Sequence, residues 1–149
     1  MSILASTNTK PSQTYTVEDF ILAGHGVSIT YDRYSYKELL SNGTEIPILN
    51  VINDYMRDFK DHAVTVQLTD EEYRKWRYRP KLMCYDIYGN QEIYWVIMLL
   101  NGMIDVKDFN LETRKLLLIP TREMASLMSA VYNAEYKYIE DYNSQKGTL

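Results

Sequence analysis

One segment, residues 80–120, constrains the fold more than any other part of the chain. It reads PKLMCYDIYGNQEIYWVIMLLNGMIDVKDFNLETRKLLLIP. Pro80 is a favourable first residue for a helix, and Gly89 supplies the positive φ with which a helix ends. Asn90 is then a good N-terminal cap for a second apolar helix that runs through Leu100. The segment therefore predicts two short apolar helices hinged at the glycine.

The same segment has no histidine and no serine, and no pair of acids faces a base in it. The whole chain has only two histidines, so a serine or cysteine triad lacks a base within reach of a nucleophile. No phosphate-binding glycine loop, CxxC or HExxH motif is present. Asp54, Asp58 and Asp61 lie close together in sequence, but they do not follow the spacing of an EF-hand loop. We therefore expect no enzyme, no cofactor and no metal site.

Tyrosine is the unusual feature of the composition, with 14 Tyr against 3 Phe in 149 residues. Tyrosine combines a large rigid surface with a polar tip, which suits interfaces that are part apolar and part wet. A protein with several partners is the preferred interpretation, and a tyrosine-rich core and surface without a special partner is the alternative. The single cysteine, Cys84, cannot form an internal disulfide, and its apolar neighbours indicate an inert buried thiol.

Charge does not favour nucleic acid or an anionic membrane as a partner, because the formal net charge is −4. Residues 74–79 form a basic run with interleaved aromatics, a pattern that can stack bases and hold phosphates. The run directly follows the acids of residues 70–72, however, and this order is the one that a helix dipole favours. We prefer the helix interpretation and keep nucleic-acid binding as an alternative. No signal peptide is evident, and the longest apolar run, residues 93–100, is too short to cross a bilayer.

Residues 63–68 alternate between apolar and polar types, which predicts a strand with Val64, Val66 and Leu68 on one face. Thr69 and Glu72 form a capping box for a helix that runs through Trp76. The remaining elements expected before this point are a strand over 27–31, a short helix over 35–40, and a helix from Pro47 to about Lys60.

After the apolar helices we expect a strand over 116–119 and a long helix that begins at Thr121. One stripe of this helix, close to heptad spacing, contains Met124, Leu127, Met128, Val131, Tyr138 and Tyr142. Packing on another chain and packing on its own domain are equal alternatives for this stripe. Glu135, Glu140 and Asp141 are interpreted as a solvated face.

Together these elements predict an α+β protein, a small and mostly helical domain with a few short strands. Residues 1–14 are rich in Ser, Thr, Asn and Gln and are expected to form a flexible arm. Residues 15–68 are interpreted as an N-terminal α/β segment and residues 69–149 as a helical core with a C-terminal helix. The two are expected to form one compact unit.

Three pieces of the segment form a recognisable pattern: Arg79-Pro80, Tyr88-Gly89-Asn90, and Tyr94 to Leu99 followed by Asn101. This pattern resembles the signature of the baseplate wedge protein family of contractile-tailed phages. The run Leu116 to Pro120 is similar to part of a LysM module in that family. The resemblance covers residues 73–120, about a third of the chain, and it carries over Pro80, Tyr88, Gly89, Trp95 and Asn101.

The resemblance implies a structural role, as a clamp-like subunit that locks neighbouring wedge proteins around the central tail hub. It also implies other wedge, hub and tail proteins as partners, several copies in a ring, and a place in the virion tail baseplate after synthesis in the host cytoplasm. The residues expected to contact partners are Trp76, Tyr88, Gly89, Tyr94, Trp95, Asn101, Met128 and Tyr138. A LysM-like module that binds peptidoglycan or another carbohydrate is the alternative function.

Overall fold

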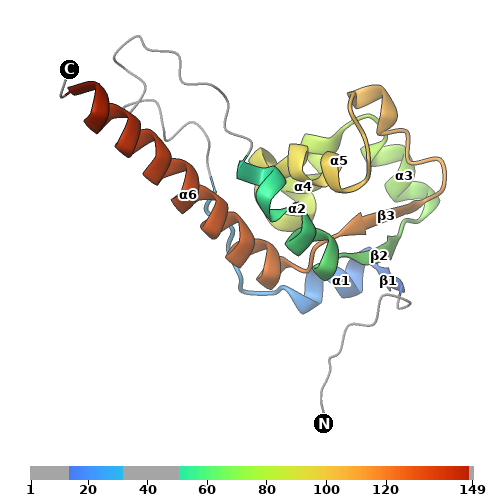
Figure 1. Ribbon diagram of the computed structural model, residues 1–149. Coiled ribbons are helices and arrows are strands. Elements are labelled where there is room, and N and C mark those ends of the chain that lie inside the picture. Colours follow the sequence, from blue (N-terminus) through green and yellow to red (C-terminus); the bar gives the residue numbers. More distant parts are fainter. Residues whose placement is uncertain (1–13, 32–50, 148–149) are drawn as a thin grey trace.

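The computed structural model describes residues 14–31 and 51–147. Within these residues the chain is mostly helical, and three short strands form one sheet (Figure 1), so the expected α+β class is confirmed. In chain order the elements are β1 (Thr14–Thr16), α1 (Val17–Ala23), α2 (Val51–His62), β2 (Val64–Gln67), α3 (Asp70–Trp76), α4 (Pro80–Tyr88), the 3-10 turn η2 (Gln91–Ile93), α5 (Tyr94–Leu100), the 3-10 turn η3 (Val106–Asp108), β3 (Lys115–Leu118) and α6 (Thr121–Gly147).

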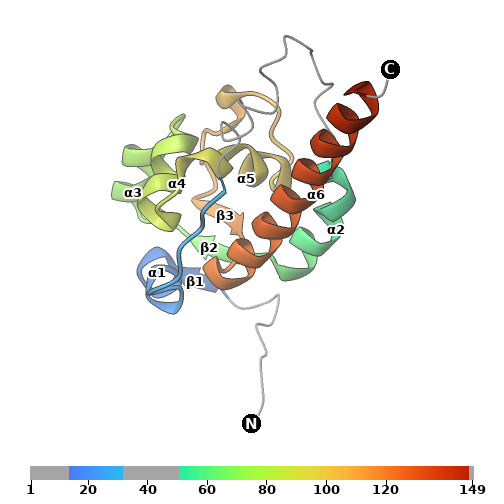
Figure 2. The same ribbon diagram turned by 90° about the vertical axis from the view of Figure 1, so that its left-hand side faces the viewer.

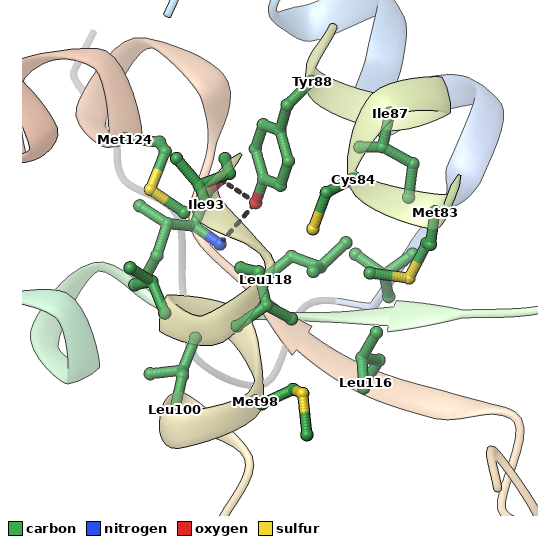
Figure 3. Close-up of a cluster of buried hydrophobic side chains, with 14 of the residues drawn as sticks. Met83, Cys84, Ile87, Tyr88, Ile93, Met98, Leu100, Leu116, Leu118 and Met124 are labelled. Carbon is green, nitrogen blue, oxygen red and sulfur yellow. Dashed lines mark hydrogen bonds between the residues drawn. The ribbon is translucent and has the colours of Figure 1, made fainter. Parts of the chain in front are cut away.

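The sheet has the order β1-β2-β3, with β1 parallel and β3 antiparallel to β2. Val64 and Val66 of β2 and Leu116 and Leu118 of β3 are buried on one face, whereas their neighbours along each strand are more exposed. The expected two-residue alternation is therefore confirmed. The buried face packs against side chains of α4 and α5, such as Met83 (Figure 3).

Local sequence signals position the helices around this sheet. Thr69 and Glu72 form the expected capping box at the start of α3. Pro80 begins α4, and Gly89 ends it with a φ of 75°. Asn90 accepts a hydrogen bond from the amide of Glu92, so it caps the turn η2 that leads directly into α5. Each of these signals acts within a few residues, which is why they could be identified from the sequence.

The last helix, α6, begins in the core and leaves it. Met124, Met128 and Val131 are fully buried, and α2 packs beside this part of the helix. In both views the C-terminal part of α6 extends past the other described elements (Figures 1 and 2). The stripe predicted from the sequence is therefore buried on its own domain at its start, and Tyr138, further along, is 48% exposed.

Helix α1 was not expected from the sequence. Thr16 caps it by accepting a hydrogen bond from the amide of Asp19, and Phe20 is buried. The helix ends at Gly24, where an added Cβ would lie 2.5 Å from the side chain of Thr121. Only glycine allows α1 to approach the start of α6 so closely.

Two expectations are wrong. Residues 27–31 form no strand, because the carbonyl groups of Ile29 and Tyr31 accept hydrogen bonds from the side chain of Asn90 instead of a neighbouring strand. Glu135 does not belong to a solvated face: it is 3% exposed, and its carboxylate accepts a hydrogen bond from the hydroxyl of Tyr31. Both errors have the same cause, a polar partner that is distant in the sequence.

Several expectations fall outside the described residues, namely the helix over 35–40, the helix start at Pro47 and the arm up to residue 13. Thr14, which was assigned to the arm, lies in β1. The division into segments 15–68 and 69–149 and the likeness of residues 116–120 to a LysM module stay predictions.

The positive φ of Gly89 predicts a selective effect of substitution. Gly89→Val should lower the free energy of unfolding by about 2 kcal/mol, because a β-branched residue is strained in the left-handed region. No atom lies within 4 Å of a Cβ added at this position, so backbone strain, and not a clash, would cause the loss. Gly89→Asn is the control, since asparagine tolerates this conformation. Equal midpoints of urea denaturation for the two variants would contradict the role of the turn.

Candidate interaction surfaces

The eight residues expected to contact partners occupy different environments. Trp76, Tyr88 and Met128 are buried, Tyr94, Trp95 and Asn101 are partly buried, and Gly89 and Tyr138 are exposed. The structure does not gather them at one place, because Trp76 ends α3 whereas Tyr138 lies far along α6. Their part in partner binding stays a prediction, but the structure gives several of them an internal role.

Tyr88, the last residue of α4, forms hydrogen bonds with Ile119, which directly follows β3. Its hydroxyl donates a hydrogen bond to the carbonyl oxygen of Ile119 (2.7 Å) and accepts one from the amide of the same residue (3.1 Å), as Figure 3 shows. Burial raises the pKa of Tyr88 well above its usual value, so the hydroxyl keeps its proton for donation. The ring also meets Phe20 of α1 edge to face, with centroids 5.8 Å apart.

Asn101 makes the equivalent contact at the end of α5. Its Nδ2 donates to the carbonyl of Leu117 and its Oδ1 accepts from the amide of Leu117, both at 2.9 Å. The Nδ2 also donates to the carbonyl of Ile97 in the last turn of α5, so Asn101 caps the end of this helix. Because β3 has β2 on its other side, Asn101 and Tyr88 occupy the outer edge of the sheet. A bare edge would expose these backbone groups to pairing with another chain.

Trp76 joins α3 to α4. Its Nε1 donates a hydrogen bond to Asp86 at 2.8 Å, and the ammonium of Lys75 pairs with the same carboxylate at 3.2 Å. The indole is 3% exposed. Trp95 of α5 is partly buried, with its ring centroid 6.3 Å from that of Tyr31. Both tryptophans thus pack within the body of the protein.

The basic run after α3 forms a cluster with residues from the loop before β3. The guanidinium of Arg114 lies 3.7 Å from the ring centroid of Tyr73, and that of Arg77 lies 5.1 Å from it. Arg77 also lies 4.9 Å from the ring centroid of Tyr78. Arg77 pairs with Glu112 at 2.6 Å and Arg114 pairs with Asp70 at 3.2 Å. We call this cluster the arginine corner; it consists of Asp70, Tyr73, Arg77, Tyr78, Glu112 and Arg114.

Strained backbone conformations occur in the arginine corner and directly beside it in the sequence. Tyr78, Leu111 and Arg114 have φ values of 60°, 56° and 55°, and they are the non-glycine residues with positive φ in the described part of the chain. Such a conformation costs about 1–3 kcal/mol per residue and persists where the surroundings impose it. The amide of Tyr78 is held by the carbonyl of Phe109 (2.8 Å), and the amide of Leu68 binds the carbonyl of Arg114 (2.7 Å). Strained backbone of this kind is common at functional sites.

No motif in the sequence identifies the arginine corner as a unit. Its ion pairs join residues 35 and 44 positions apart, so no short motif contains both partners. The residues in the left-handed conformation are tyrosine, leucine and arginine, which are not typical of that conformation. The interleaving of bases and aromatics in residues 74–79 was the available signal.

A second exposed surface lies on the later part of α6. Tyr136 is 39% and Tyr138 is 48% exposed, and the ring of Tyr136 stacks on that of Tyr132 with centroids 6.1 Å apart. Tyrosines that are partly exposed and held by stacking are frequent in protein interfaces.

Other kinds of site receive no support from the described residues. Within residues 14–31 and 51–147, no three His, Cys, Asp or Glu side chains are grouped so that they could hold a metal ion. None of the helices in these ranges combines the length and the hydrophobicity that a bilayer crossing demands. Cys84 is buried, as expected, and burial raises the pKa of its thiol, which disfavours the reactive thiolate.

The contact of Tyr88 with Ile119 can be tested by removing one oxygen atom. Tyr88→Phe should lower the free energy of unfolding by about 1–3 kcal/mol, because two buried backbone groups lose their partner. Tyr85→Phe is a matched control on the same helix, since Tyr85 is 61% exposed, and it should change stability by less than about 0.5 kcal/mol. Guanidinium denaturation curves measure both, and a Tyr88→Phe protein as stable as the Tyr85→Phe protein would contradict the assignment.

A comparison with known protein families agrees with the resemblance noted in the sequence. The family model described as Base plate wedge protein 53 matches residues 27–112, more than half of the chain. The match includes α2 to α5 and the segment from Pro80 to Asn101, and it ends before residues 116–120. No curated protein and no solved structure matches the chain significantly. The chain therefore belongs to the base plate wedge protein 53 family, and it is a structural component of the phage tail baseplate.

Proposed function

We propose that this protein joins neighbouring wedge proteins of the baseplate and clamps them around the central hub of the tail. The observation that carries the proposal is the position of two exposed surfaces of interface character on opposite sides of one body. The arginine corner lies at α3, and Tyr136 and Tyr138 lie on the later part of α6. Both views place α3 and the C-terminal part of α6 on opposite sides (Figures 1 and 2).

A subunit that holds two neighbours needs a rigid connection between its two contact surfaces. Tyr88 and Asn101 supply such a connection, because they bind the helices α4 and α5 to the outer edge of β3. Asn90 adds a third connection, since its side-chain amide donates hydrogen bonds to the carbonyl groups of Ile29 and Tyr31, both at 2.9 Å. These contacts join parts of the chain that lie far apart in sequence. A body held together in this way supports a structural role between two neighbours.

Helix α6 is the element best suited to reach a neighbour. Its 27 residues correspond to a length of about 40 Å at 1.5 Å per residue. Its first turns are anchored in the core through Met124 and Met128, whereas its later turns expose Tyr136 and Tyr138. We infer that these tyrosines contact an adjacent wedge protein, and that several copies of the protein surround the hub in a ring.

Loss of the protein should stop baseplate assembly. In cells infected with a virus that lacks this gene, negative-stain electron microscopy should show filled heads together with tails or hubs that have no complete baseplate. The reason is that wedges without their connector cannot close around the hub. Complete and normal virions in the same lysates would contradict the proposed role.

The α6 surface can be tested separately by complementation of that virus. The double variant Tyr136→Ser, Tyr138→Ser should fold, because its side chains are exposed, but it should restore few infectious particles. Tyr85→Ser is the matched control, since it also removes an exposed tyrosine from a helix. Equal titres from the two variants would show that α6 does not carry the contact.

A further inference from the structure

The two segments that meet at the arginine corner are basic within an acidic protein, although the six residues that define the corner include two arginines and two acids. The formal net charge of the chain is −4, yet residues 70–81 and 112–115 contain seven of its 16 Lys and Arg and only four acids. Contacts within the corner bring these two segments together in space. We propose that the arginine corner is a docking surface for an acidic segment of a neighbouring baseplate protein. This inference rests on the proposed connecting role, and it specifies the chemistry of one of the two contacts.

The guanidinium groups of the corner are packed against Tyr73, and their acidic partners are more exposed to solvent than they are. Arg77 and Arg114 both lie over the ring of Tyr73, and their side chains are 35% and 31% exposed. The carboxylates of Glu112 and Asp70 are 56% and 75% exposed. Exposed ion pairs contribute little stability, so these acids are displaced at small cost. A segment that brings several carboxylates then finds two arginines already in position for bidentate contacts.

The backbone of the corner prepares this position before a partner arrives. Tyr78 and Arg114 are held in the left-handed conformation by hydrogen bonds with Phe109 and Leu68. The Nη2 of Arg77 binds the carboxylate of Glu112 at 2.6 Å and the hydroxyl of Tyr78 at 3.2 Å, so displacement of Glu112 would make this group available to a partner. Tyr78 is 46% exposed beside it, and tyrosine with arginine is a frequent combination at binding hot spots.

Carboxylates fit this surface better than nucleic-acid bases. Binding of single-stranded nucleic acid depends on aromatic faces that are free to stack with bases. Here the ring of Tyr73 lies beneath two guanidinium groups, and Arg77 lies over the ring of Tyr78. The indole of Trp76 is 3% exposed. Of the aromatic side chains in the basic run, Trp76 is therefore buried and Tyr78 has a guanidinium over its ring, so few aromatic faces are free to stack with bases.

The test measures binding of a fluorescein-labelled peptide of eight alternating Asp and Glu residues to the purified full chain by fluorescence anisotropy. The wild-type protein should bind the peptide, with an affinity that decreases as salt is added. The double variant R77Q/R114Q should weaken binding by at least about tenfold, because the bidentate contacts are lost. Lys107→Gln removes an exposed positive charge in η3 and should leave the affinity within about twofold.

A second variant changes the affinity in the opposite direction. D70N/E112Q removes the acids that compete for the two arginines, so it should bind the peptide several-fold more tightly than the wild type. This gain cannot result from misfolding, which protects the test against an unstable R77Q/R114Q protein. Absence of salt-dependent binding to the wild type, or equal affinities for all four proteins, would overturn the proposal.

Two further outcomes would replace the acidic segment by a different partner of the arginine corner. Tighter binding of an oligothymidine with the same number of negative charges would replace the acidic protein segment by nucleic acid. A salt-sensitive dimer of the wild type in sedimentation, lost in R77Q/R114Q, would make a second copy of this chain the occupant. Because the assay uses isolated protein, its failure leaves the connecting role untouched, whereas normal virions without the gene would remove that role itself.

Discussion

The fold depends on hydrogen bonds from two side chains, Tyr88 and Asn101, to the outer edge of the sheet. The three strands have only three or four residues each, which is short for strands of a sheet, so the sheet depends on packing against the helices. Tyr88 and Asn101 satisfy the outward amide and carbonyl groups of Ile119 and Leu117, as a fourth strand would do. Because these two side chains come from the ends of α4 and α5, the edge of the sheet is joined directly to the helices that cover its face. Sheet and helices therefore form one structure.

Several residues of the family pattern take part in contacts within the protein and do not lie on the two candidate interaction surfaces. Tyr88, Asn90 and Asn101 direct their polar groups to the backbone of their own chain. Tyr88 and Asn101 were expected to contact partners, which stays a prediction, and the structure shows that they also bind within the fold. The surfaces of interface character lie elsewhere, at the arginine corner and on α6. A pattern that identifies a structural family can thus consist largely of residues that hold its shape.

Sequence reasoning succeeded where the interacting groups are close in the chain. The capping box of α3, the proline and glycine that bound α4, and the alternation of β2 each act within one element. It failed where a polar side chain acts at long range: Asn90 lies 61 positions from Ile29, and Tyr31 lies 104 positions from Glu135. The alternation at residues 27–31 predicted a strand, and in the structure Ile29 and Tyr31 of this segment are buried. It gave no information on whether a strand or an asparagine would satisfy their carbonyl groups.

The same edge contact also fixes the direction of α6, which lies outside the part that matches the family. Ile119, held by Tyr88, precedes the first residue of α6, Thr121, by two positions. Gly24 then allows α1 to pack against Thr121, so the start of the helix is held from two sides. A rigid helix amplifies any change of angle at its base over its whole length. The position of Tyr138 relative to the arginine corner is consequently set in the core, by the hydroxyl of one buried tyrosine and the missing side chain of one glycine.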